Sequence, residues 1–267
     1  MKKIVRTVWI SSVLAALGAM LGAWLGWQQA GDLPTIAEAT ELAGALTPGV
    51  PATEFTRRTH LSGSEHTAES GDPSAEIVGG AEEWGAGFVD IPFPQPVTDL
   101  VPVRERLRAA GWRTGEVTAT ELGGAPGSEL TAARGDWRMV VVATDRWSSG
   151  WARVERAEPP AALVLSLLLA VAGAVLGWFV ARRPAGPRWA LGAAGLVMLT
   201  PATLLAIVNV ARDVAGFGGT GPVPLPWEPF GALYFRPLTV LGLALAAVWV
   251  TTVLAGRRAA AGAVTTS

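Results

Sequence analysis

The chain contains no cysteine, which excludes disulfide bonds, thiolate nucleophiles and cysteine-ligated metals. Histidine is nearly as scarce, since only His60 and His66 occur. Their spacing, with Glu65 between them, matches no standard ligand pattern, so we expect a solvated loop and no metal site. The sequence also lacks a serine–histidine–aspartate set, a phosphate-binding loop and a dinucleotide-binding glycine turn. We therefore predict no cofactor and no enzymatic activity.

Charged residues are few. They make up 16% of the chain, whereas a soluble domain usually has about 25%, and half of the residues are hydrophobic. Lysine occurs only as Lys2 and Lys3, and a net charge of −1 gives no basis for binding nucleic acid. The abundance of arginine, alanine and glycine is typical of a high-GC bacterium. Because the apolar residues are clustered in blocks, the composition predicts a membrane protein that contacts the lipid bilayer.

Four apolar blocks without charged residues are long enough to cross a bilayer, which takes about 20 residues in a helix. They cover residues 8–27, 161–181, 189–210 and 238–255. The first block is longer than the core of a typical signal peptide and ends at a poor cleavage site. We therefore expect a retained signal anchor, with cleavage as the alternative. The fold class predicted is a four-helix transmembrane protein.

Basic residues flank these blocks on one side of the predicted membrane. The clusters are Lys2, Lys3 and Arg6, then Arg182, Arg183 and Arg188, then Arg257 and Arg258. The positive-inside rule places residues 1–7, 182–188 and 256–267 in the cytoplasm. Residues 30–160 and the aromatic, glycine- and proline-rich loop 211–237 then lie outside.

The outer segment begins with residues 28–74, which are acidic and interrupted by proline and glycine. This composition is typical of a linker. Within it, Thr35 and Glu38 have the spacing of a capping box, which predicts a short helix that runs to Leu46.

Residues 75–146 have the pattern of a small folded domain. The predicted elements are one strand, one helix and three strands, over residues 87–93, 98–110, 116–120, 129–133 and 137–144. This order predicts an α+β domain in which a helix packs on an antiparallel sheet. Asp90 and Asp99 have no basic partner that the pattern reveals. Residues 147–160 are expected to be a juxtamembrane connection.

Small residues at four-residue spacing predict close helix contacts within the membrane. Gly18, Gly22 and Gly26 form such a row in the first span, and Gly173 and Gly177 repeat the spacing in the second. We expect these residues to pack against another helix. A homo-oligomer formed through the first span is a further option.

Two other features concern the spans. Pro201 lies in the middle of the third span and predicts a helix kink. Asn209 lies near the outer end of that span, where we favour an interhelical hydrogen bond over a ligand contact. Tryptophans near span ends and in the outer loop are typical of membrane-interface anchors: Trp9, Trp27, Trp178, Trp189, Trp227 and Trp249.

The function that this pattern favours is non-enzymatic. We expect the outer domain to bind envelope proteins or cell-surface components, while the helices hold it in the cell membrane. A transporter or channel component is the alternative, although the four spans contain no ionisable residue of the kind that marks ion pathways. An envelope enzyme is a third reading, which lacks a nucleophile–base pair.

Overall fold

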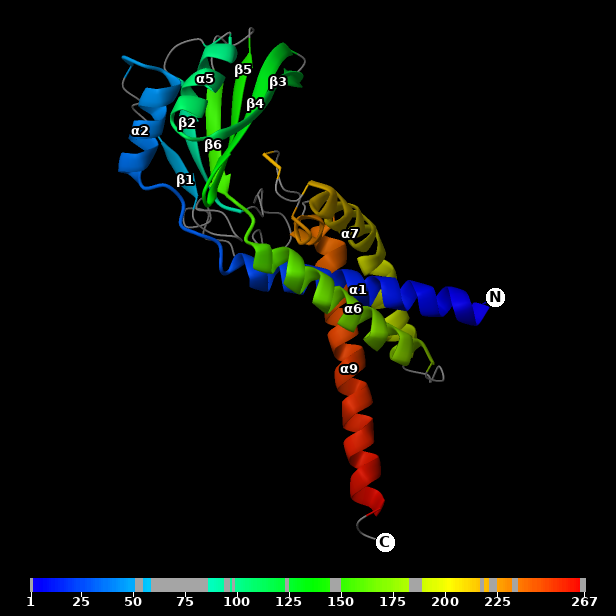
Figure 1. The fold of residues 1–267 in the computed structure, drawn as a ribbon. Coiled ribbons are helices and arrows are strands. Elements are labelled where there is room, and N and C mark those ends of the chain that lie inside the picture. Colours follow the sequence, from blue (N-terminus) through cyan, green and yellow to red (C-terminus); the bar gives the residue numbers. More distant parts are fainter. Residues whose placement is uncertain are drawn as a thin grey trace.

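The computed structural model describes residues 2–50, 55–58, 86–93, 97, 99–122, 125–144, 150–182, 189–216, 219–220, 225–231 and 235–264. Figure 1 shows two parts, a sheet with two helices on it and a group of long helices. The two histidines and Glu65, which we predicted to lie in a loop, fall outside the described residues.

Six antiparallel strands form one sheet. In chain order they are β1 (Thr56–Arg58), β2 (Phe88–Pro92), β3 (Arg113–Leu122), β4 (Ala125–Arg134), β5 (Trp137–Thr144) and β6 (Gly150–Arg156). Their spatial order is β1-β2-β6-β5-β4-β3. In this order the last strand in the sequence, β6, lies in the middle of the sheet. The tight turn between β4 and β5 contains Gly135 at φ 56°, a left-handed conformation that favours glycine.

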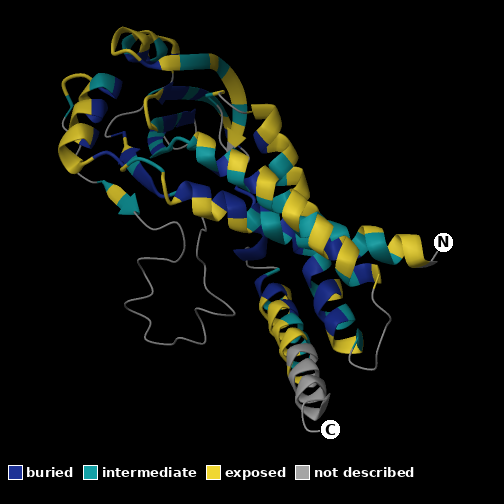
Figure 2. Cartoon of the chain, turned by 60° about the horizontal axis from the view of Figure 1, so that its bottom comes forward, coloured by how far each residue is buried: buried dark blue, intermediate teal, exposed yellow. Residues whose placement is uncertain are grey.

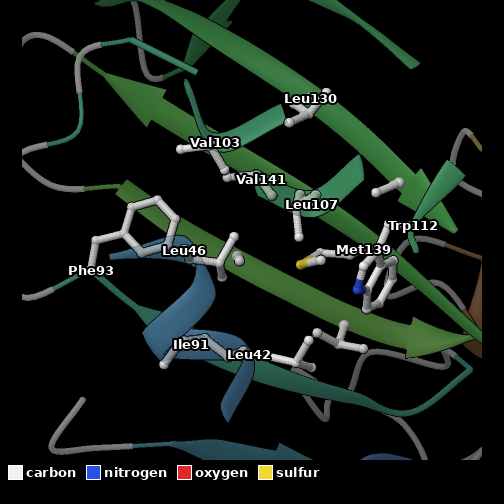
Figure 3. Packing of buried hydrophobic residues seen from close by; sticks show 14 of the residues in the cluster. Leu42, Leu46, Ile91, Phe93, Val103, Leu107, Trp112, Leu130, Met139 and Val141 are labelled. Carbon is white, nitrogen blue, oxygen red and sulfur yellow. The ribbon is translucent and has the colours of Figure 1, made fainter. Parts of the chain in front are cut away.

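Two helices, α2 (Ile36–Leu46) and α5 (Val101–Ala109), cover one face of this sheet. Figure 3 shows side chains from both helices converging on side chains from the strands. Leu46 and Leu107 are completely buried there, as are Met139 and Val141 of β5. Burying a large apolar side chain is worth about 1.5–3 kcal/mol, so this layer is the main source of the domain's stability.

The predicted capping box of α2 is present. The Thr35 hydroxyl accepts a hydrogen bond from the Glu38 backbone N–H at 3.3 Å, and the Glu38 carboxylate accepts one from the Thr35 N–H at 2.8 Å. The bonds that the Glu38 carboxylate accepts from the Thr35 N–H and hydroxyl lower the pKa of Glu38. The N-cap of α5 is Leu100, which makes no side-chain capping bond, and Asp99 before it accepts a hydrogen bond from the Val101 N–H at 2.8 Å. Gly111 at φ 84° follows the end of the helix.

The structure adds three segments to the predicted outer domain. We expected its limits at residues 75–146, with a linker before and a juxtamembrane connection after. Instead, α2 packs on the core, β1 pairs with β2, and β6 pairs with both β2 and β5. Ala152 and Val154 of β6 are completely buried, because alternate residues of this strand face the helix layer. The segment at 150–156 is therefore part of the sheet.

The rest of the described chain is helical. Its helices are α1 (Lys2–Trp27), α6 (Pro160–Arg182), α7 (Trp189–Gly216), the short α8 (Glu228–Gly231) and α9 (Arg236–Val264). Three of them are long and apolar enough to cross a membrane: α1 from Lys3, α6 and α7. The described apolar part of α9, Arg236–Thr252, is shorter than that length.

The long helices pack as two antiparallel pairs, α1 with α6 and α7 with α9. Ile10 and Leu199 belong to the buried cluster that joins the pairs. In Figure 1, α9 crosses the α1–α6 pair at a steep angle, so the four helices are not all parallel. Figure 2 shows exposed residues along these helices, and many are large and apolar, such as Leu168 and Val171. Exposed apolar side chains are expected where a helix faces lipid.

Candidate functional site

The second face of the sheet, opposite α2 and α5, carries polar and aromatic side chains from β2 and β6. Asp90 and Arg153 are direct cross-strand partners on this face. The Arg153 guanidinium donates from Nε to Asp90 Oδ1 at 2.8 Å and from Nη2 to Oδ2 at 2.9 Å. This two-point pairing fixes both side chains in one orientation.

Aromatic rings surround the Arg153 guanidinium. Its central carbon lies 4.0 Å from the centre of the Phe88 ring and 5.5 Å from that of Trp151. A pocket of about 490 Å³ opens beside the pair, and it is lined by Thr56, Asp90, Pro92, Trp151 and Arg153. Ligand sites are typically concave, with aromatic walls and a few fixed polar groups. We call these five lining residues the sheet-face pocket.

The chemistry available in the sheet-face pocket is recognition. The Asp90 carboxylate is held by a guanidinium, and the pocket lining contains no second acid, no histidine and no nucleophile–base pair. Among the described residues, no group of three or more metal-ligating side chains could hold a metal ion. The arrangement offers a fixed charge pair and an aromatic ring for contact with a partner.

A second cluster joins the outer domain to α7. Glu158 follows β6 and precedes α6, Asp213 lies near the C-terminal end of α7, and Arg138 lies on the second face of β5. The Glu158 and Asp213 carboxyl groups influence each other electrostatically, and both interact with the Arg138 charge. Glu158 Oε2 is buried without a hydrogen-bond partner. Asp213 is only 4% exposed and Arg138 only 9%. We call these three residues the junction cluster.

Burial dominates the electrostatics of the junction cluster. It raises the pKa of Glu158 to about 8, and the neighbouring Asp213 adds to this effect while Arg138 opposes it. Burial also lowers the pKa of Arg138, although the carboxyl groups of Glu158 and Asp213 offset part of the change. Glu158 therefore holds a proton at a pH where an exposed glutamate is ionised.

The predicted glycine rows lie between α1 and α6. A Cβ atom built on Gly18 would lie 2.1 Å from the Leu169 carbonyl oxygen, and one on Gly22 would lie 2.2 Å from that of Leu165. A Cβ atom on Gly26 would lie 2.2 Å from the Ala162 Cα. In α6, Gly173 and Gly177 lie against the backbone of Leu14 and of Ile10 and Ser11, respectively. The row in α1 is thus occupied by α6 of the same chain.

The predicted tryptophan anchors fall into two groups. Trp27 and Trp227 are almost completely buried and contact each other edge to face, with ring centres 5.9 Å apart. Their contact holds the outer loop against the end of α1, so these rings do not face lipid. Trp189 and Trp249 make a similar contact at 5.6 Å.

The remaining two anchors, Trp178 and Trp9, lie toward the same end of the helices as Trp189 and Trp249. Trp178 is 38% exposed, and the Arg182 guanidinium lies 3.6 Å from its ring centre. The indole N–H of Trp9 donates to the Thr200 hydroxyl at 3.0 Å. Of the six predicted anchors, Trp178 has the most exposed position among the described residues.

Pro201 lies within α7, which continues through it as one helix. Proline cannot supply the N–H that would bond to the Val197 carbonyl. The residue directly before it, Thr200, donates from its hydroxyl to the Leu196 carbonyl at 2.8 Å. Asn209 donates from its side-chain amide to the Leu225 carbonyl at 3.1 Å, which ties the outer loop to α7.

Sequence reasoning did not find the partner of Asp90 or the junction cluster. Arg153 lies 63 positions from Asp90, within a segment that we had not predicted to be a strand. The alternation of Ala152 and Val154 with charged residues over 151–156 was an available signal for that strand. Comparisons with protein-family models, curated proteins and solved structures find no match to this chain.

Proposed function

We propose that the chain is a non-enzymatic membrane protein whose outer domain binds a protein or another component of the cell envelope. The observation that carries this proposal is the sheet-face pocket. The helix layer stabilises the domain from one side only, so the second face is not needed for the core. That face instead holds a charge pair and the Trp151 ring at a hollow, which is typical of a recognition surface.

The membrane topology that we propose with this function is the one that the basic clusters predict. Both termini and residues 182–188 lie in the cytoplasm, and the outer domain lies outside. One observation supports this topology. The outer domain follows the end of α1 and precedes the start of α6, and these two helix ends are neighbours. In this arrangement the helices carry the domain at the outer surface of the cell membrane.

A transport or channel component is the second candidate. One observation favours it, namely that α7 continues to Gly216 and so includes Arg212 and the buried Asp213. Buried ionisable residues in membrane helices often mark ion or proton pathways. Asp213 lies in the last turn of α7 and interacts electrostatically with Glu158 and Arg138, which supports a role at the boundary between the two parts.

The proposed binding function is tested by photocrosslinking from the sheet-face pocket. A photoreactive phenylalanine analogue replaces Trp151 in cells, and irradiation should give a discrete covalent adduct that mass spectrometry identifies. Arg153→Lys keeps the charge but loses the two-point pairing with Asp90. It should lower the adduct yield by about tenfold, because hydrogen bonds to charged groups are worth about 1.5–3 kcal/mol.

The matched control places the same analogue at Ala109, an exposed residue of α5 on the opposite layer. No specific adduct is expected there. Equal adducts at both positions, or an Arg153→Lys yield equal to that of the wild type, would show that the pocket does not select the partner.

A further inference from the structure

The sheet-face pocket lies toward the end of β6 that is farther from α1 and α6. Arg156, at the other end of β6, donates a hydrogen bond to the Ala86 carbonyl, and Ala86 packs on the cluster around Trp27 of α1. Shortly after Arg156 the chain enters α6 at Pro160. A rise of about 3.3 Å per residue places Trp151 roughly 16 Å along the strand from Arg156. The pocket is therefore set away from the attachment of the domain to these helices.

Three polar side chains of the pocket form one row across three strands. Thr56 of β1 is directly opposite Asp90 of β2, and Asp90 is directly opposite Arg153 of β6. Direct cross-strand partners lie on the same face of a sheet. The Asp90 and Arg153 side chains are 26% and 29% exposed, so a molecule from solution can reach both. The row presents a hydroxyl, a carboxylate and a guanidinium side by side.

The Asp90 carboxylate retains capacity to accept hydrogen bonds. Each of its oxygens has two lone pairs, and Arg153 uses one on each oxygen. The two-point pairing fixes the direction of the other lone pairs before a ligand arrives, which lowers the entropy lost on binding. The Thr56 hydroxyl can both donate and accept. A ligand with several hydroxyl groups close together matches this set.

The charges on this part of the sheet cancel. Asp90 and Arg153 have opposite signs, and in the next row Arg58 and Glu155 lie on either side of Phe88 with opposite signs again. A strongly charged partner is attracted by a surface with charge of one sign, which these rows do not provide. The pocket therefore favours a neutral ligand.

Trp151 gives the pocket a flat apolar wall beside its polar row. The centre of its ring lies 5.5 Å from the central carbon of the Arg153 guanidinium. The face of an aromatic ring carries partial negative charge and attracts C–H groups. A sugar ring has C–H groups on one face and hydroxyl groups around its rim, so it can contact the wall and the row together.

The size of the pocket also fits a small rigid unit. Its volume of about 490 Å³ lies within the range of small-molecule sites, and five described residues line it. A stable protein interface uses about 20–30 residues on each side.

We propose that the sheet-face pocket binds a neutral carbohydrate of the cell envelope. One sugar ring stacks on Trp151, and its hydroxyl groups bond to Asp90 and Thr56, while Arg153 holds Asp90 in position. This inference rests on the proposed binding function and names the class of ligand.

An oligosaccharide array tests the ligand class with the full chain in lipid nanodiscs. The nanodiscs are displayed in many copies on one bead, because several weak contacts together give a measurable signal. The probes are neutral oligosaccharides of hexoses and N-acetylhexosamines, anionic oligosaccharides that contain uronic acids, and neutral peptides. We expect binding to neutral oligosaccharides. Asp90→Asn should reduce it about tenfold or more, because bonds to an ionised group are stronger than bonds to an amide. Trp151→Ala should cause a similar loss because the stacking wall is removed.

Glu121→Gln is the matched control, since it makes the same chemical change at an exposed position of β3, on the opposite edge of the sheet. It should bind as the wild type does, and unchanged melting temperatures of all three variants show that they are folded. Binding of peptides or anionic oligosaccharides in place of neutral ones, or wild-type binding by Trp151→Ala and Asp90→Asn, would overturn the proposal. If the array shows no carbohydrate binding but crosslinking at Trp151 captures a protein, the carbohydrate inference fails and the binding function stands. If both experiments are negative, both fail.

Discussion

Gly22→Ala is expected to separate α1 from α6 and to lower the thermal stability of the protein in mild detergent. Alanine normally stabilises a helix relative to glycine by about 1 kcal/mol, so an ordinary site would become more stable. At Gly22, however, the new Cβ would lie 2.2 Å from the Leu165 carbonyl oxygen and 2.5 Å from its carbon. Both atoms are backbone, so only a shift of the helix relieves the overlap. We expect a loss on the order of 1–2 kcal/mol, the upper range for membrane helix contacts.

Gly44→Ala is the matched control. Gly44 lies in α2, and nothing lies within 4 Å of where its Cβ would be. The same substitution there should leave stability unchanged or raise it by up to about 1 kcal/mol. If Gly22→Ala raised the melting temperature as Gly44→Ala does, the close packing of α1 on α6 would be wrong.

The second large effect concerns the limits of the outer domain. A fragment of residues 31–158 should fold alone, whereas one of residues 75–146 should not. The shorter fragment lacks β6, which pairs with two strands and buries Ala152 and Val154, and it also lacks α2. Each large buried side chain contributes about 1.5–3 kcal/mol, and a whole domain is stable by only about 5–15 kcal/mol. Circular dichroism during urea unfolding should show a cooperative transition only for the longer fragment.

Two point variants of the longer fragment support the same test. Leu107→Asp places a charge at a completely buried position and should abolish the transition. Arg108→Asp changes an exposed neighbour and should retain it. Cooperative unfolding of residues 75–146 would contradict the central place of β6 in the sheet.

Local signals predicted many elements of the outer domain. Thr35 and Glu38 predicted where α2 starts, because a capping box depends only on residues three positions apart. The alternation around Val141 predicted β5, and the buried face of α5 with Val103 and Leu107 followed from helical spacing. Such features depend on residues within one helix or strand, so they can be predicted from the sequence alone.

Features that depend on distant residues could not be predicted in the same way. Acidic residues around α2 suggested a linker, yet Leu42 and Leu46 belong to the core. Asp90 had no visible partner until β6 placed Arg153 opposite it. Thr131 and Thr220 meet only because the chain after α7 returns to the sheet, and nothing in local spacing encodes that contact.

Cysteine labelling across the membrane tests most directly the claim that the helices hold the domain outside the cytoplasm. Three exposed positions report on the outer domain, on the start of α1 and on α9: Thr118→Cys, Lys3→Cys and Ala255→Cys. The reagent is a membrane-impermeant maleimide, applied to cells whose outer envelope layers have been removed. We predict that Thr118→Cys reacts in intact cells, and that the other two react only after the membrane is permeabilised. Labelling of Lys3→Cys and Thr118→Cys alike in intact cells would contradict the topology, and labelling of Ala255→Cys in intact cells would contradict the fourth span.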